Sequence, residues 1–160
     1  MGVTLRTVCR ADAEQILRWE NDAAVQRVSE GAACYSRAEI EGFIIDQQNG
    51  FETEGQLRFM IAAPDGHAAG CVDLFGLDRV SRSAGVGILV YEPSDRRRGY
   101  ALSALSLLEE YAAAGLRLRS LWCRVQAGNE ASLGLFAKAG YVQAGPSDGG
   151  ILLLRKDIAR

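Results

Sequence analysis

The chain of 160 residues lacks several features that would assign it quickly to a function class. It has a single histidine, His67, which excludes a histidine-based metal cluster and argues against a histidine-dependent catalytic triad. No apolar run approaches the ~20 residues of a membrane span, and the N-terminus has no apolar signal core. These absences predict a cytoplasmic protein with no membrane partner and no metal.

The sequence also has no excess of positive charge and no paired cysteine motif. Its formal net charge of −2 argues against a nucleic-acid partner. The four cysteines are far apart and are expected to lie reduced in the core. Because neither G-x-G-x-x-G nor G-x-x-x-x-G-K-[ST] occurs, a nucleotide-binding α/β module is disfavoured.

What the sequence does contain indicates a single α/β domain over residues 1–160. A chain of this length buries about 70% of its unfolded surface and needs no disulfide or metal. Alternating or apolar segments predict strands at 3–8, 56–63, 68–77, 83–91, 121–125 and 151–154. Helices are expected from Asp12, from a capping box of Ser36 and Glu39, from Gly99 to Ala114, and after Asn129. Residues 49–55 are expected to break the chain.

One stretch organises the rest of the chain. A strand ends at Pro93, three consecutive arginines follow, and a helix starts directly after Gly99. The start of a helix leaves backbone N–H groups without partners, and the helix dipole favours phosphate oxygens there. The pattern therefore predicts a phosphate-binding loop, with an ordinary basic surface loop as the alternative.

The motif Arg96-x-x-Gly99-x-Ala101, followed by Asn129-x-x-Ser132-x-x-Leu135-Phe136-x-Lys138-x-Gly140-Tyr141, resembles the GNAT superfamily of acetyl-CoA-dependent N-acetyltransferases. It is most similar to the branch that includes ribosomal-protein N-terminal, spermidine and amino-sugar acetyltransferases. The resemblance implies a mixed, mostly antiparallel, splayed sheet flanked by helices, with acetyl-CoA as cosubstrate. It also implies direct attack on the thioester by a primary amine of a peptide N-terminus, an amino sugar or a polyamine. A homodimer is a family-level expectation.

The resemblance also assigns cofactor contacts. In this family the central strand pairs with the pantetheine arm of CoA like an added strand, the loop binds the pyrophosphate, and Asn129 reaches the pantetheine arm or only caps its helix. The expected cofactor-binding residues are Leu89, Tyr91, Arg96, Arg97, Arg98, Gly99, Tyr100, Ala101, Asn129 and Phe136.

The catalytic residues depart from the family pattern. Relatives carry a glutamate where this chain has Val86 or Arg124, and many carry a tyrosine at the place of Phe136. Asp73 is predicted as a substitute base, with Glu92 beside Pro93 as an alternative. Ser132 is predicted as the group that protonates the leaving thiolate.

These departures bear on the acceptor. Neutralising a lysine-like amine at pH 7 costs ~4.6 kcal/mol, whereas an α-amine costs only ~1.4 kcal/mol, so a missing base mildly favours a peptide N-terminus or an amino sugar. Segments 20–35 and 74–82 are expected to form the acceptor wall. The alternative function is a CoA-binding sensor with little or no activity.

Overall fold

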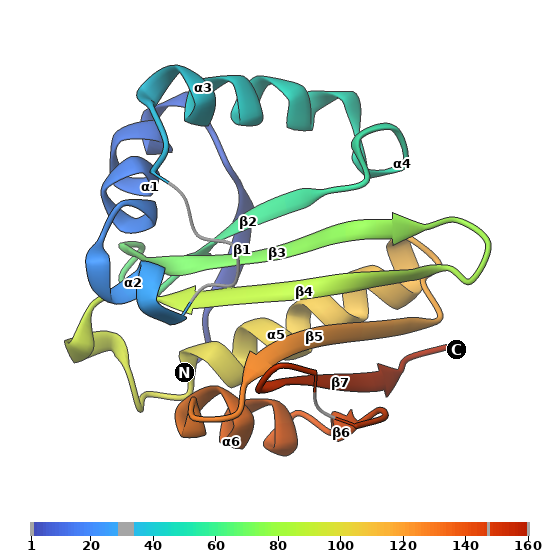
Figure 1. Ribbon diagram of the computed structural model, residues 1–160. Helices are drawn as coiled ribbons and strands as arrows, with labels where there is room; N and C mark the ends of the chain where they lie inside the picture. Colours follow the sequence, from blue (N-terminus) through green and yellow to red (C-terminus); the bar gives the residue numbers. More distant parts are fainter. Residues whose placement is uncertain (1, 29–33, 147, 160) are drawn as a thin grey trace.

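Seven strands form one sheet in the order β1-β2-β3-β4-β5-β7-β6 in the computed structural model, which describes residues 2–28, 34–146 and 148–159 (Figure 1). All neighbouring strands are antiparallel except β4 and β5, which are parallel. The expectation of a mixed, mostly antiparallel sheet is therefore confirmed. The strands are β1 (Thr4–Thr7), β2 (Leu57–Ala62), β3 (Ala68–Asp78), β4 (Ser83–Val90), β5 (Ser120–Gln126), β6 (Val142–Gln143) and β7 (Ile151–Asp157).

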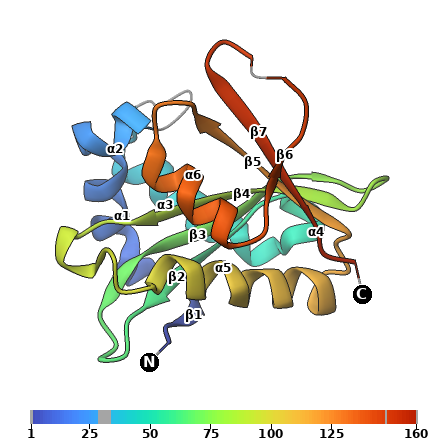
Figure 2. The same ribbon diagram turned by 90° about the horizontal axis from the view of Figure 1, so that it is seen from below.

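The helices divide between the two faces of the sheet. Figures 1 and 2 show α1 to α4 on one face and α5 with α6 on the other. One short helix occupies the segment 49–55, which was expected to be only a chain break. The helices are α1 (Ala13–Glu20), α2 (Ala23–Val28), α3 (Arg37–Asp46), α4 (Phe51–Glu54), α5 (Tyr100–Glu110) and α6 (Glu130–Lys138).

Two helix starts have the side-chain caps that the sequence predicts. The hydroxyl of Ser36 accepts from the Glu39 backbone N–H at 3.1 Å, and the Glu39 carboxylate accepts from the Ser36 N–H at 3.0 Å. Asn129 caps α6, because its side-chain oxygen accepts from the Ser132 N–H at 3.2 Å. Such caps satisfy N–H groups that have no partner within the helix, and each contributes ~1 kcal/mol.

The sheet carries a separate apolar core on each face. The larger core packs α5 on the sheet through Ala104, Leu105 and Leu108, and the smaller one packs α1 and α3 around Ile16 and Ile44. No helix in the described part of the chain is long and apolar enough to cross a membrane.

The prediction that all four cysteines lie in the core is half wrong. Cys71 and Cys123 are buried, but Cys9 and Cys34 are exposed, and all four are free thiols. Burial raises the pKa of Cys71 and of Cys123 to about 12, which makes both thiols poor nucleophiles.

Candidate active site

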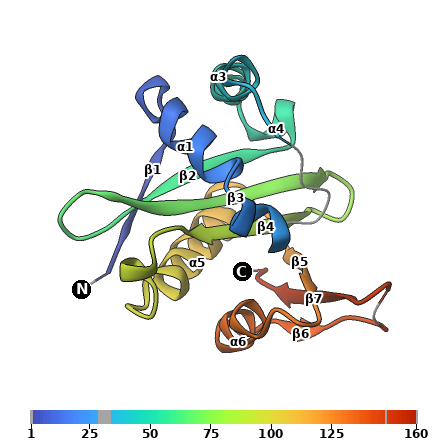
Figure 3. The same cartoon turned by 60° about the vertical axis from the view of Figure 1, so that its left-hand side comes forward.

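The sheet opens between its two parallel strands. The pairing of β4 with β5 covers Ser83 to Gly85, and no further pair joins these strands in the described residues. At the last pair, the rings of Phe75 and Trp122 meet edge to face, with centroids 5.3 Å apart, and a Cβ on Gly85 would lie within 3 Å of both rings. Beyond this point the strands diverge toward their C-terminal ends, where the loop after β4 and α6 are found (Figures 1 and 3). The splayed sheet implied by the resemblance is therefore present.

Hydrogen bonds at the two ends of β4 show which backbone groups face this opening. The N–H of Tyr91 donates to the Ala69 oxygen of β3 at 3.0 Å, and the Arg82 oxygen accepts from the Arg119 N–H, on the β5 side, at 2.7 Å. Strand residues alternate in the side to which their backbone groups point. The odd-numbered residues of β4 therefore bond to β3, and the even-numbered residues face β5 or the opening.

This alternation bears on the predicted backbone contacts with the cofactor. The carbonyl of Leu89 lies against Gly70 of β3, 1.7 Å from where a Cβ would stand, and the N–H of Tyr91 is bonded to β3. The contacts of Leu89 and Tyr91 with the cofactor stay predictions. The backbone groups that face the opening are those of the even-numbered residues 86, 88 and 90.

Tyr91 has a different role in the structure. Its hydroxyl donates to the Asp22 carboxylate at 2.5 Å, and its ring stacks on Trp19 with centroids 5.7 Å apart. The hydrogen bond to Asp22 raises the pKa of Tyr91. The Tyr91 side chain therefore links the end of β4 to Trp19 of α1 and to Asp22, which lies between α1 and α2.

The loop before α5 has the geometry of an anion-binding site. Arg97 and Gly99 adopt positive φ values of +62° and +79°. In the described residues, none of the backbone N–H groups from Arg97 to Leu102 donates to another backbone group. The segment 97–102 leads into and includes the first turn of α5, an 11-residue helix, where the helix dipole also favours negative charge.

The arginine side chains of this loop largely fix its shape. Arg96 donates to the carbonyls of Val90 and Tyr91 at 3.1 and 3.0 Å, and Nε of Arg98 donates to the Ser94 carbonyl at 2.8 Å. Tyr100 is buried in the larger core, so only its backbone N–H is available to a ligand. Main-chain N–H groups, the exposed Arg97 and the two terminal nitrogens of the exposed Arg98 remain as donors for a phosphate.

Of the two site residues predicted on helix α6, Ser132 is partly accessible and Phe136 is buried. Ser132 is half-buried in the first turn. Phe136 is only 3% exposed and packs edge to face on Tyr141, with centroids 5.0 Å apart. The apolar side of the helix turns the Phe136 ring into the core, and contact of this ring with the cofactor stays a prediction.

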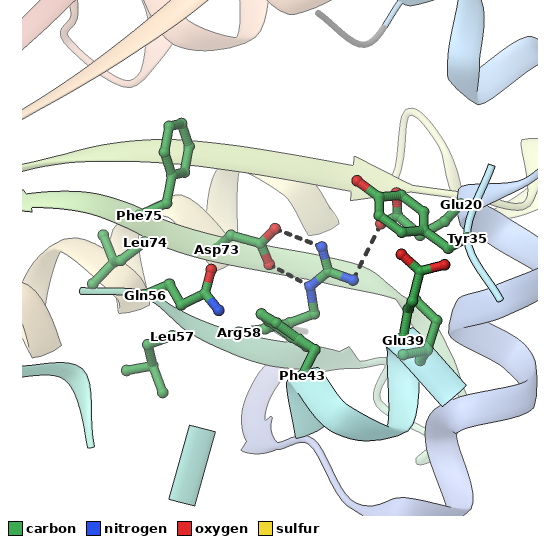
Figure 4. A pocket seen from close by; sticks show the side chains of 11 residues that line it. Glu20, Tyr35, Glu39, Phe43, Gln56, Leu57, Arg58, Asp73, Leu74 and Phe75 are labelled. Carbon is green, nitrogen blue, oxygen red and sulfur yellow. Dashed lines mark hydrogen bonds and ion pairs between the residues drawn. The ribbon is translucent and has the colours of Figure 1, made fainter. Parts of the chain in front are cut away.

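A cavity of about 390 Å³ lies on the face of the sheet that carries α1 and α3. Figure 4 shows carboxylates from three elements directed toward it: Glu20 from α1, Glu39 from α3 and Asp73 from β3. The apolar part of the lining includes the rings of Tyr35 and Phe43. Glu20, Tyr35 and Leu74 belong to the segments predicted as the acceptor wall, whereas Glu39, Phe43 and Arg58 were not predicted.

Arg58 is the one cation among the described lining residues of this cavity, and each nitrogen of its guanidinium has a carboxylate partner. Its Nε and Nη2 each donate to an oxygen of Asp73 at 2.7 Å, and its Nη1 lies 3.1 Å from Glu20 (Figure 4). Burial by itself lowers the pKa of Arg58, but the carboxylates, Asp73 above all, outweigh it and hold the pKa well above its usual value. The cavity therefore contains three carboxylates and no uncommitted cation.

Asp73 connects this cavity to the opening in the sheet. It pairs with Gly87 of β4, and its carboxylate lies 3.8 Å from where a Gly87 Cβ would stand. The last residue of β4 that pairs with β5 is Gly85, and Gly87 lies two positions beyond it. Asp73 therefore lies where the opening between β4 and β5 begins. Val86 is buried on the other face, in the α5 core, so a carboxylate at that position would not reach the cavity.

The described residues contain no cluster of three His, Cys, Asp or Glu side chains that could hold a metal ion. The single histidine lies in the turn between β2 and β3, as the sequence predicts, and it contacts Asp95 in the loop after β4. The contact between His67 and Asp95 joins residues 28 positions apart, and no sequence pattern predicts it.

Comparisons with known proteins agree with this geometry. A family model described as an acetyltransferase (GNAT) domain matches residues 3–142. The spermidine N(1)-acetyltransferase of Escherichia coli K12 is 27% identical over 140 residues, which are 88% of this chain and 73% of that protein.

Solved structures of a Vibrio cholerae enzyme have the same fold. Its spermidine N-acetyltransferase in complex with CoA and spermine gives a TM-score of 0.82 at 20% identity, covering 97% of this chain and 95% of that one. A dodecameric form of the spermidine N-acetyltransferase from Vibrio cholerae gives a TM-score of 0.78 at 20% identity, covering 98% of this chain and 94% of that one. Since the family model spans most of the sequence, this chain belongs to the acetyltransferase (GNAT) family and is an acetyl-CoA-dependent acyltransferase.

Proposed function

We propose that this chain acetylates a terminal primary amine of a polyamine. The observation that carries the proposal is the charge of the cavity beside the opening, which is lined by three carboxylates and one guanidinium, with two of the carboxylates, Glu20 and Asp73, paired to that guanidinium. An acceptor with a carboxylate would meet three carboxylates and would have to share Arg58 with Asp73 and Glu20, which already contact all three of its nitrogens. An acceptor with several ammonium groups would find acceptors for each. The polyamine substrates of the relatives in Escherichia coli and Vibrio cholerae support the same choice.

The proposed cofactor site uses main-chain donors. The pyrophosphate of acetyl-CoA would accept from the free N–H groups between Arg97 and Leu102, and the pantetheine arm would follow the open edge of β4. Along that edge the N–H of Ile88 is oriented to donate to the arm or to the thioester carbonyl, where it would stabilise the negative charge that develops on attack. The side-chain amide of Asn129 is committed in part to its helix cap.

The reacting amine and the distal ammonium groups need different environments. The nitrogen that attacks must be neutral, and losing its proton costs ~4.6 kcal/mol for a pKa of ~10.4 at pH 7. Carboxylates that hold distal ammonium groups strengthen binding without making this step harder. We assign the distal role to Glu20 and Glu39, which come from the helices, and the reacting amine to Asp73 at the mouth of the opening.

Asp73 can serve this role although Arg58 already holds it. Each carboxylate oxygen accepts more than one hydrogen bond, so the pair of bonds from Arg58 leaves further capacity on both oxygens. The neutral amine then attacks the thioester carbonyl, and Asp73 accepts the proton that the attacking nitrogen gives up as the amide forms. The tetrahedral intermediate collapses with cleavage of the C–S bond, and CoA leaves as the thiolate. The Ser132 hydroxyl is our candidate donor of the proton that this sulfur receives, and water returns a proton to the serine.

The experiment compares two primary amines of equal chain length, one ending in a second ammonium and one in an uncharged group. We expect the diamine to have a kcat/KM at least about tenfold higher, because two charge-assisted contacts of ~1 kcal/mol each are lost with the neutral end. Glu39→Gln should reduce that preference by about fivefold and should leave the monoamine unchanged. The substitution keeps the capping box with Ser36, since glutamine also serves at that position. Equal values for the two amines in the wild type would refute the proposal.

A homo-oligomer is proposed as well, on the precedent of the dodecameric Vibrio cholerae structure. Light scattering coupled to size-exclusion chromatography tests it, and a monomer at all concentrations would refute it.

A further inference from the structure

The loop that precedes α5 contains a buried carboxylate. Asp95 ends the short helical turn Pro93–Asp95 and is only 6% exposed, whereas most of the residues around it in the loop are exposed. A carboxylate out of water needs a partner that donates hydrogen bonds. The side-chain partner of Asp95 in the described residues is His67, whose Nε2 lies 3.0 Å from both carboxylate oxygens.

His67 itself lies between two carboxylates. It follows the turn that joins β2 to β3, where its backbone N–H donates to Asp65 at 3.0 Å and its Nδ1 lies 2.5 Å from the same oxygen. Only the imidazolium has an N–H on both ring nitrogens, and the neutral ring would turn a lone pair toward one of the carboxylates. The pKa of His67 is raised accordingly, first by the hydrogen bond with Asp95 and then by the one with Asp65.

The contact joins two parts of the chain that are distant in sequence. On one side is the β2–β3 turn, and on the other is the loop whose next residue, Arg96, is tied to the carbonyls at the end of β4. The loop is therefore held by Arg96 against β4 and by Asp95 against the turn. The free N–H groups that we assign to the cofactor start only two residues after Asp95.

We propose that His67 and Asp95 are positioning residues for the cofactor loop, so that affinity for CoA depends on the protonation of His67. This inference rests on the proposed cofactor site. Protonated His67 holds Asp95 and with it the arrangement of N–H groups that receives the pyrophosphate. Deprotonated His67 turns a lone pair toward a carboxylate and loosens one of the two ties on the loop.

The direction of the pH effect follows from the raised pKa of His67. The bridge is complete below ~6.5, the pKa of histidine in an unfolded chain, and is lost as the pH rises through the higher pKa of the folded protein. Affinity for CoA should therefore weaken across that interval, by about two- to fivefold, as expected for a half-exposed ion pair. By reciprocity, saturation with CoA should raise the pKa of His67.

The experiment follows His67 directly in the untagged full-length chain. Because it is the single histidine of the sequence, its imidazole signals in NMR are unambiguous. The pH titration of these signals is recorded with and without CoA, and the backbone amide signals of residues 97–102 are followed in the same samples. We expect those amides to shift when CoA is added and the His67 titration to move to higher pH.

The two possible failures give different results. If the amides of residues 97–102 do not respond to CoA, the proposed cofactor site is wrong. If they respond but the titration of His67 is the same with and without CoA, the cofactor site stands and the inference about His67 is refuted.

Two variants separate positioning from a merely structural role. The phosphate monoester of CoA titrates near pH 6, so the informative quantity is the difference in pH dependence between the wild type and His67→Gln. We expect the variant to lose the His67-dependent part of the change in Kd. Asp65→Asn is the matched control, because it leaves the contact between His67 and Asp95 intact. The Kd for CoA at low pH should therefore not change. Since Asp65 also raises the pKa of His67, the affinity for CoA should begin to weaken at a lower pH in this variant. A pH dependence in His67→Gln identical to that of the wild type would overturn the inference.

Discussion

Arg58→Met tests whether the charges of the cavity are organised as the structure indicates. The Arg58 side chain is 13% exposed, and those of Asp73 and Glu20 are 24% and 23% exposed. Removing one partner of a fully buried ion pair costs ~3–5 kcal/mol, because an uncompensated charge remains. Water reaches about a quarter of each carboxylate here, so we expect a loss of roughly 2–3 kcal/mol in the free energy of unfolding. For a domain of this size that corresponds to a Tm lower by roughly 4–12 °C.

The loss should depend on pH in a defined direction. In the variant, three carboxylates remain in the cavity, and two of them, Glu20 and Asp73, have lost the guanidinium that they shared; protonating either of these two relieves their repulsion. The stability deficit should therefore shrink as the pH falls from about 7 to about 5. Urea denaturation at both pH values measures it, with the wild type as reference.

A control on the protein surface separates this effect from the loss of any arginine. Arg37 pairs with Glu41 one helical turn away, and the two side chains are 57% and 30% exposed. Arg37→Met should cost at most ~0.5 kcal/mol, with little dependence on pH. The reasoning is refuted if Arg58→Met is as mild as this control, or if its deficit is the same at both pH values.

Three further predictions concern packing, thiols and the leaving group. A Cβ at Gly70 would stand 1.7 Å from a backbone oxygen of β4, whereas one at Gly87 meets no atom closer than 3.8 Å, so Gly70→Ala should lower the Tm far more than Gly87→Ala in thermal denaturation. A thiol reagent should label two cysteines rapidly in the native protein and all four in denaturant, since Cys71 and Cys123 are buried; rapid labelling of all four in the native protein would contradict the packing. Ser132→Ala should lower kcat by about tenfold or more with little change in the KM for acetyl-CoA, and an unchanged kcat would remove Ser132 from the mechanism.

Local sequence signals predicted the fold and the starts of its helices well. The Ser36 and Asn129 caps, and the glycine before α5, depend on residues near one another in the chain, and each is found where it was expected. The splayed sheet was implied by the resemblance to the family and not by local signals, and it is present as well.

The direction in which a residue points is what the motifs leave open in the site. Backbone direction alternates with every residue of a strand, so the contacts predicted for Leu89 and Tyr91 depend on a register that is exact to one position. Phe136 was assigned by its place in a motif, and the helix turns its ring into the core. Motif position alone does not determine either direction.

The charged cluster of the cavity could not be predicted from sequence. Arg58, Asp73 and Glu20 come from three elements, and the closest of them in sequence are 15 residues apart. Asp73 was identified as a candidate, but its partner Arg58 carries no local signal. The absence of a glutamate at Val86 and at Arg124 mildly favours a peptide N-terminus or an amino sugar, whereas the three carboxylates in the assembled cavity favour a polyamine.

The most direct test of the polyamine proposal is a competition for a limiting amount of acetyl-CoA. The purified chain is mixed with spermidine, a peptide with a free α-amine and an amino sugar at equal concentrations, and mass spectrometry identifies the acetylated product. The proposal predicts that the acetyl group is recovered on spermidine. Recovery on the peptide or the sugar, or acetyl-CoA that stays unconsumed, would contradict it.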